Sequence, residues 1–123
     1  MFHAVIDSSA WSAYFAGDKI PFIDAALAAR AVRVPPLQIT ELLANDLPTK
    51  ERQIFEIFLS RLPLCECDRE HFTRAAALQK EASSRSIFLS ARDAHIAQCA
   101  LDIRGILITR DPLFLELQRF CSL

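Results

Sequence analysis

Short apolar runs alternate with longer segments of helical periodicity along this chain. Strands are expected over residues 2–6, 31–34, 64–67 and 106–109. Helices are expected over residues 8–16, 21–30, 37–45, 49–62, 69–84 and 91–104, with a short last helix opening at Asp111-Pro112. Strands that alternate with helices are typical of an α/β domain with a mainly parallel sheet. The length of 123 residues, without repeats or linkers, predicts a single domain over residues 1–123.

Most of the expected helices begin at or next to a residue that favours a helix N-terminus. The expected N-caps are Ser8 or Ser9, Thr49, Asp68 and Ser90. Pro21 is expected in the first turn of its helix, and Gly17 is expected to end the helix before it.

The composition argues against several classes of protein. Apolar residues make up 52% of the chain and only two residues are glycine, which argues against disorder. The first residues lack the pattern of a signal peptide, and no apolar run is long enough to cross a bilayer. A cytoplasmic protein without membrane contact is therefore expected. The net charge of -1 means that nucleic-acid binding would require a local basic patch.

The spacing of the cysteines and histidines does not predict a metal site. Cys65, Cys67, Cys99 and Cys121 form no C-x-x-C motif, and the three histidines are scattered along the chain. We therefore expect free thiols and no zinc site.

Four acidic residues stand where an open α/β sheet places its sites. Asp7 follows the first strand and Asp111 follows the last, and ligands bind at the carboxyl ends of such strands. Asp93 lies in the first turn of a helix, and Glu41 lies in the helix after the second strand. Each also has a purely structural interpretation, because the three aspartates suit helix N-termini and Glu41 could be a solvated helix residue. Spacing alone does not show that the four converge.

Four segments resemble, in order, the motif blocks of PIN-domain ribonucleases: AVIDSSAW, QITELLAN, LSARDAHIAQCAL and ILITRDPLF. In particular they look like the VapC-type toxins of type II toxin–antitoxin pairs, over the whole chain. The resemblance implies a PIN-like three-layer fold, in which a short, mainly parallel sheet is flanked by helices. Two positions depart from the pattern. Pro112 stands shortly after the last acid, where many relatives carry a second acid, and His95 stands where a small or apolar residue is commoner.

The resemblance also implies metal-dependent RNA cleavage with water as the nucleophile. Its catalytic and metal-binding acids match Asp7, Glu41, Asp93 and Asp111, with Glu41 either a ligand or the residue that orients the water. Ser9 and Thr109 match positions that often carry a hydroxyl, and they are expected to hydrogen-bond the ligands. Oxygen ligands without Cys or His suit Mg²⁺ or Mn²⁺. Such an ion lowers the pKa of a bound water and stabilises the charge that builds on a phosphoryl group.

The expected partners are RNA, an antitoxin protein and a second copy of the chain. Arg92 and Arg110 each adjoin a motif acid, so they could contact RNA phosphates or form surface ion pairs instead. The helix over residues 49–62 carries apolar residues nearly all round, so it is either core or shared with a partner. The residues assigned to a candidate partner groove are Trp11, Phe15, Ile54, Phe55 and Phe58.

Two alternatives to a ribonuclease remain open at this stage. A non-catalytic PIN-like binding module would share the fold, although the chain keeps all four acids. A phospho-receiver domain has a similar size and pattern, but it would need a second acid beside Asp7 and a late lysine. No lysine follows Lys80.

Overall fold

The computed structural model describes residues 2–44 and 48–123. The elements are β1 (Ala4–Ile6), α1 (Ser8–Phe15), α2 (Pro21–Ala28), α3 (Pro36–Leu43), α4 (Thr49–Ser60), α5 (Arg69–Ser84), α6 (Ala91–Asp102), β2 (Ile106–Ile108) and α7 (Leu113–Leu117). The two strands pair in parallel, with Ala4 opposite Ile106 and Ile6 opposite Ile108. The prediction of an α/β fold with a short parallel sheet flanked by helices is confirmed.

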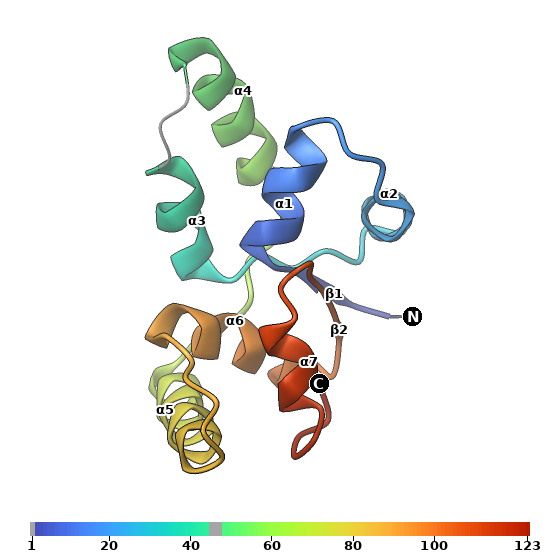
Figure 1. The fold of residues 1–123 in the computed structure, drawn as a ribbon. Helices are drawn as coiled ribbons and strands as arrows, with labels where there is room; N and C mark the ends of the chain where they lie inside the picture. Colours follow the sequence, from blue (N-terminus) through green and yellow to red (C-terminus); the bar gives the residue numbers. More distant parts are fainter. Residues whose placement is uncertain (1, 45–47) are drawn as a thin grey trace.

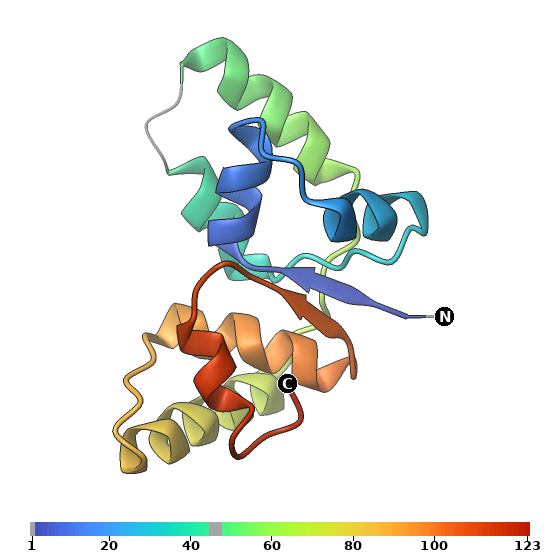
Figure 2. The same ribbon diagram turned by 45° about the vertical axis from the view of Figure 1, so that its right-hand side comes forward.

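The helices form two layers with the strands between them. Helices α1 to α4 lie on one side of β1 and β2, and α5, α6 and α7 lie on the other side (Figures 1 and 2). Ala4 and Ile6 pack in the core that contains Trp11, whereas Val5 packs against Ile96 on α6. Successive side chains of a strand point to opposite faces. All three residues of β1 are fully buried because both of its faces are covered.

Residues 31–34 and 64–67 add to the sheet only at single positions. One isolated parallel bridge joins Val32 to β1, and another joins Val34 to Leu64. The prediction that these two segments form strands was therefore wrong in extent. The proline that follows Val34 has no N–H group, so the pairing cannot continue past it.

Two of the predicted helix caps are confirmed. The Asp68 carboxylate accepts a hydrogen bond from the His71 N–H at 2.9 Å, at the start of α5. The Ser90 hydroxyl accepts one from the Asp93 N–H at 3.0 Å, at the start of α6. At both helix starts the capping side chain satisfies an N–H group of the first turn.

Two other predicted caps were wrong by one residue. The N-cap of α1 is Asp7 rather than a serine, because the Asp7 carbonyl already accepts the N–H groups of Ala10 and Trp11, each at 3.0 Å. The N-cap of α4 is Pro48, and Thr49 is already helical. The side chains of Asp7 and Pro48 make no capping hydrogen bond. The preference of Ser and Thr for the N-cap position therefore did not predict where these two helices start.

Strand β2 consists of apolar residues, yet it is partly exposed. Ile106 is 51% exposed, and the other two residues of the strand are half-buried. Within the described residues β2 pairs with β1 alone, so one of its edges has no strand beside it. The apolar composition of the strand therefore overstated its burial. The end of the helix predicted over residues 37–45 falls partly outside the described residues.

Helix α4 is divided into a core side and a solvent side. Phe55 and Leu59 are buried, while Ile54 and Ile57 are 61% and 55% exposed. The helix is thus neither fully buried nor free of the core, and two large apolar side chains remain at its surface. In the described part of the chain, no helix has the length and apolar character needed to cross a membrane.

Candidate active site

Asp7 is buried at the end of β1 and is held by two hydroxyl groups. Its side chain does not cap α1, and the residue is only 4% exposed. One carboxylate oxygen, Oδ2, accepts hydrogen bonds from Ser9 Oγ at 2.6 Å and from Thr109 Oγ1 at 2.8 Å. A buried carboxylate without partners would be strongly unfavourable, so these donors make its burial tolerable. The capping interpretation of the Asp7 side chain is therefore wrong.

The same two hydroxyls connect Asp7 to the segment after β2. Thr109 Oγ1 also accepts the backbone N–H of Asp111 at 2.9 Å, and Ser9 Oγ accepts that of Arg110 at 3.2 Å. The Asp111 carboxylate accepts the Leu113 N–H at 3.0 Å, at the start of α7. Asp111 therefore has a local structural role, and Thr109 fixes its position relative to Asp7.

Glu41 joins the same region through α3. It accepts a hydrogen bond from the hydroxyl of Ser8, the residue after Asp7. Its other oxygen pairs with Arg92 Nε at 2.8 Å, and its side chain is only 16% exposed. Gln38, one turn before Glu41, donates to the Ile6 carbonyl at 2.7 Å. Glu41 is thus oriented toward the strand end and is not the solvated helix residue of the structural interpretation.

Asp93 lies at the start of α6, beside Arg92. Its backbone N–H makes the capping bond to Ser90, as expected. Its carboxylate makes no hydrogen bond or ion pair with the residues that the structure describes. The side chain is half-buried. The cap therefore accounts for the backbone of Asp93 and leaves its carboxylate available.

The four acids belong to linked elements, but they do not form a closed set of ligands. Among the described residues, no three of these carboxylates form a group close enough to hold one metal ion. In this arrangement some of the contacts between the acids and an ion would run through water. Because Mg²⁺ in proteins keeps several waters, this all-oxygen donor set fits a partly hydrated Mg²⁺ or Mn²⁺.

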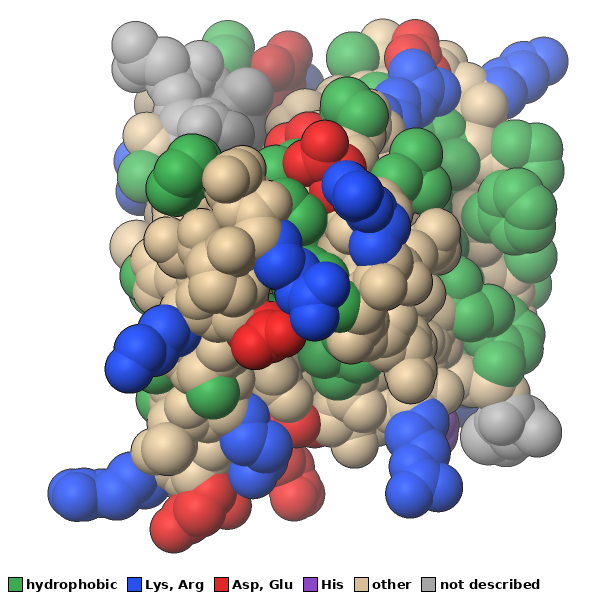
Figure 3. Space-filling view, turned by 60° about the horizontal axis from the view of Figure 1, so that its bottom comes forward, with side chains coloured by type: hydrophobic (Ala, Val, Ile, Leu, Met, Phe, Trp, Pro, Cys, Tyr) green, Lys and Arg blue, Asp and Glu red, His purple; other side chains and the backbone are tan. Residues whose placement is uncertain are grey.

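Both candidate RNA-binding arginines are paired with acids. Arg92 contacts Glu41, and Arg110 Nη1 contacts Asp18 Oδ2 at 2.8 Å. Each arginine side chain is about half exposed, so phosphate oxygens could compete with these carboxylates. Figure 3 shows one face of the molecule on which basic and acidic side chains lie next to one another.

The residues of the candidate partner groove divide between core and surface. Trp11 is fully buried, Phe55 is 8% exposed and Phe58 is half-buried, so these three belong to the core around α1 and α4. Phe15 and Ile54 are 43% and 61% exposed. Together with Phe55 and Glu51 they line a surface hollow of about 290 Å³.

Two residues that orient the site were missed in the sequence. Ser8 bonds Glu41, and Gln38 Nε2 also reaches the Ser8 hydroxyl, at 3.2 Å. Gln38 stands three residues before Glu41, a spacing that puts both on one face of α3. That spacing was the signal available in the sequence.

Comparison with known proteins identifies the family of this chain. A search of curated protein sequences found no match. A sequence model of the PIN domain matches residues 4–119, which include β1, β2 and all four acids. The buried aspartate, its two hydroxyl donors and the acids on the neighbouring elements lie within that match, and the chain belongs to the PIN-domain family.

Proposed function

We propose that this chain is a Mg²⁺- or Mn²⁺-dependent endoribonuclease in which water attacks an RNA phosphodiester. PIN domains are typically metal-dependent nucleases, and membership of the family removes the receiver-domain alternative. The observation that carries the proposal is the buried Asp7 carboxylate. Two hydroxyls hold it at the carboxyl end of parallel strands, beside the segment that carries Asp111.

The acidic residues would bind the cation, and two hydroxyl groups would orient Asp7. Asp7, Asp93 and Asp111 would hold the cation, directly or through water. The bound cation would lower the pKa of a water and stabilise negative charge on the phosphoryl group. Ser9 and Thr109 would fix the Asp7 carboxylate by their hydrogen bonds.

Glu41 would bind the cation or accept a hydrogen bond from the attacking water. Its contacts with Ser8 and Arg92 hold it on the side of the strand end that faces α6. Arg92 and Arg110 would contact RNA phosphates by exchanging their present carboxylate partners for phosphate oxygens. Such contacts would position the RNA without selecting its sequence.

We also propose that the chain is the toxin of a type II toxin–antitoxin pair and forms a homodimer. The hollow beside Phe15 and Ile54 offers exposed apolar surface for a segment of an antitoxin. Exposed apolar residues of this kind favour contact with another protein. The alternative is a non-catalytic PIN-like module that binds RNA without cutting it.

A cleavage assay on labelled single-stranded RNA separates these two functions. The parent protein should cleave in Mn²⁺ and not in chelator, and Asp7→Asn should lose at least about a hundredfold in rate because the cation supplies several kcal/mol. The matched control is Asp24→Asn, which alters an exposed acid on α2 that bonds Tyr14. Cleavage that survives chelation, or that Asp7→Asn retains, contradicts the proposal.

The toxin role is tested by expression in a bacterial host without an antitoxin. The parent chain should arrest growth, and Asp93→Asn should relieve the arrest at an equal level of folded protein. Normal growth with the parent chain at confirmed folded levels would count against a toxin.

A further inference from the structure

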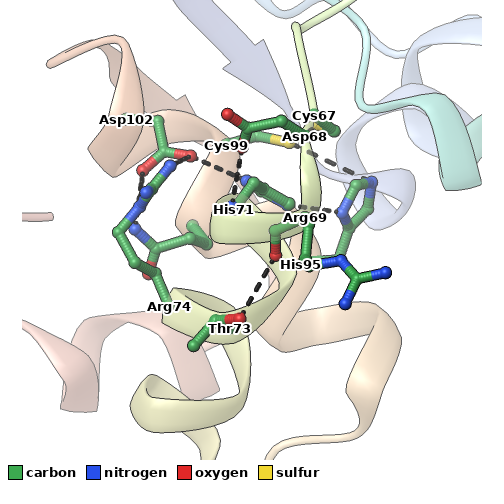
Figure 4. A network of polar contacts seen from close by, with 10 residues as sticks. Cys67, Asp68, Arg69, His71, Thr73, Arg74, His95, Cys99 and Asp102 are labelled. Atoms are coloured by element: carbon green, nitrogen blue, oxygen red, sulfur yellow. Dashed lines mark hydrogen bonds and ion pairs between the residues drawn. The ribbon is translucent and has the colours of Figure 1, made fainter.

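Two cysteines and two histidines from distant segments meet where the start of α5 packs against α6. Cys67 precedes α5, His71 lies in the first turn of α5, and His95 and Cys99 lie one turn apart on α6 (Figure 4). One ligand atom from each residue lies within 4.8 Å of the others. Cys67 is half-buried and the other three are buried. His71 and His95 are far apart in the sequence, and the packing of α5 against α6 brings them together.

The distances between these atoms are close to those of a tetrahedral metal site. The Sγ atoms of Cys67 and Cys99 are 3.7 Å apart. Two thiolates on one Zn²⁺ lie about 3.8 Å apart, given Zn–S bonds of about 2.3 Å. His71 Nε2 and His95 Nδ1 are 2.8 Å apart, and His95 Nε2 is 4.0 Å from Cys99 Sγ. These distances involve the two different nitrogens of the His95 ring, and one imidazole binds one ion through a single nitrogen, so the ring must turn slightly on binding. Each distance lies within about 0.6 Å of its tetrahedral value.

The hydrogen bonds of His71 prepare its other nitrogen for a metal. His71 Nδ1 lies 2.7 Å from Asp102 Oδ2. Arg74 Nε and Gln98 Nε2 donate hydrogen bonds to the same carboxylate, at 3.0 Å and 2.8 Å. A carboxylate only accepts, so the proton lies on Nδ1 and the lone pair of Nε2 faces the cluster. Histidine ligands of metals are commonly oriented by a carboxylate in this way.

His95 is buried beside the other ligands. Its Nδ1 lies 2.8 Å from His71 Nε2, and the residue is only 2% exposed. Two thiolates and one Zn²⁺ sum to zero charge, and such a unit can be buried without a net charge. Binding would release the two thiol protons to solvent. Sulfur and imidazole ligands suit Zn²⁺ and not Mg²⁺ or Mn²⁺, which the oxygen-rich site would take.

We propose that Cys67, His71, His95 and Cys99 form a structural Zn²⁺ site that fastens the start of α5 to α6. Four protein ligands leave no open position for substrate, which is the pattern of a structural zinc site. A surface hollow of about 420 Å³ is lined in part by Asp68 and Asp102, which bond the backbone and the side chain of His71. Because His95 is two residues after Asp93, the ion would also fix the part of α6 that carries this acid.

Metal analysis of the full-length protein tests the proposal. Protein purified from zinc-supplemented cells without chelator should hold one zinc ion per chain. The Co²⁺ form should show the visible bands of tetrahedral cobalt and a sulfur-to-cobalt charge-transfer band. This spectroscopic test needs no variant, so it is independent of any folding defect. Absence of both the zinc and the charge-transfer band would overturn the proposal.

Variants locate the ion in the chain. Cys99→Ser should lose stoichiometric zinc, whereas Cys121→Ser, which changes a thiol outside the cluster, should keep it. Asp102→Asn should weaken zinc binding by about 10- to 100-fold. Asp7→Asn should keep the zinc, because the acidic site is separate. Loss of zinc from Asp7→Asn with retention in folded Cys99→Ser would overturn the assignment.

A disulfide between Cys67 and Cys99 is the competing outcome. Peptide mapping under non-reducing conditions distinguishes it. Four free thiols after removal of zinc support the metal site. A Cys67–Cys99 disulfide that forms in place of zinc binding would overturn the proposal and make this pair a redox element.

Discussion

At the scale of single residues, Asp7 owes its position to donors from opposite ends of the chain. Ser9 is two residues away, whereas Thr109 is 102 positions away in sequence. The strand and the acid after it could be predicted from the run of apolar residues that stops at Asp7. The contact with Thr109 could not, because only the pairing of β1 with β2 creates it. Resemblance to a family indicated Thr109, and local sequence did not.

Thr109→Val should weaken the site while keeping its shape. The substitution removes the donor to Asp7 and the acceptor of the Asp111 N–H. Mn²⁺ affinity should fall by about 10- to 100-fold, as for other groups that orient a ligand. Stability should fall by about 1–3 kcal/mol, because buried partners are left unpaired. Calorimetric Mn²⁺ titration and urea unfolding in chelator measure the two effects.

The control for this change is Thr73→Val on α5. The Thr73 hydroxyl is exposed and bonds the Arg69 carbonyl of its own helix at 3.3 Å. Thr73→Val should leave the Mn²⁺ affinity unchanged. Equal effects of the two substitutions would show that Thr109 has no special link to the metal site.

Asp93→Asn and Ser90→Ala should separate the two roles of the start of α6. Asn keeps the backbone N–H that Ser90 caps, so the melting temperature in chelator should not fall. The rise that Mn²⁺ gives to the parent should be largely lost, because Asn removes a charge that attracts the cation. Ser90→Ala should instead lose about 1 kcal/mol in chelator and keep the response to Mn²⁺. Thermal melts of the three proteins, with and without Mn²⁺, decide whether Asp93 contributes only to the cap.

At the scale of secondary-structure elements, helices were predicted better than strands. The starts of α5 and α6 follow from side chains that bond the first turn, which is local chemistry. The segments 31–34 and 64–67 alternate as strands do, yet each pairs at one position. Pairing depends on a partner distant in sequence, so alternation alone does not fix its extent. The proposed zinc site also depends on contacts between distant segments. The C-x₃-H and H-x₃-C spacings can be read in the sequence, but the packing of α5 against α6 is what brings the two pairs together.

Helix α4 shows why an apolar pattern can serve two purposes. Phe55 packs against Phe15, with ring centroids 4.3 Å apart, whereas Ile54 points to solvent one residue earlier. Phe55→Glu should unfold or strongly destabilise the chain, because a lone charge would be buried. Ile54→Glu should change stability by no more than about 0.5 kcal/mol. It should still weaken antitoxin binding if the hollow beside Phe15 receives the partner.

Urea unfolding and pull-down with the product of a neighbouring antitoxin gene measure these outcomes. Lys50→Glu, on an exposed position of the same helix, provides the control for added negative charge. An Ile54→Glu protein that binds the antitoxin as well as the parent does would exclude this hollow as the contact surface.

At the scale of the whole molecule, the two helical layers are joined where the beginning and the end of the chain pair. The Ile106 N–H bonds the His3 carbonyl at 2.9 Å, immediately before β1 and β2 run side by side. Gly105 lies at this junction, and a Cβ atom there would sit 2.8 Å from the His3 carbonyl oxygen. The sequence predicted Gly105 only as the end of a helix. Its role in the approach of two backbones became evident from the fold.

Gly105→Ala should therefore displace β2 and disturb the acidic site. We expect a loss of about 1–3 kcal/mol, in the range of an overpacked position, together with weaker Mn²⁺ binding because Thr109 moves with the strand. Gly17→Ala is the matched control. Gly17 has a φ of +102° and open space around it, so Ala should cost about 1 kcal/mol by backbone strain alone and leave Mn²⁺ affinity intact. Parallel loss of affinity in both variants would contradict this account.

The pairing of the first strand with the last also has a consequence for protein synthesis. A chain made from its N-terminus contains α1 to α4 before β2, Thr109 and Asp111 have been made, so the first layer of helices can fold early. Until then Asp7 lacks one of its two hydroxyl donors, and the acidic site lacks Asp111. The proposed nuclease would therefore remain inactive until the segment that carries β2 and Asp111 has been made and has paired with β1.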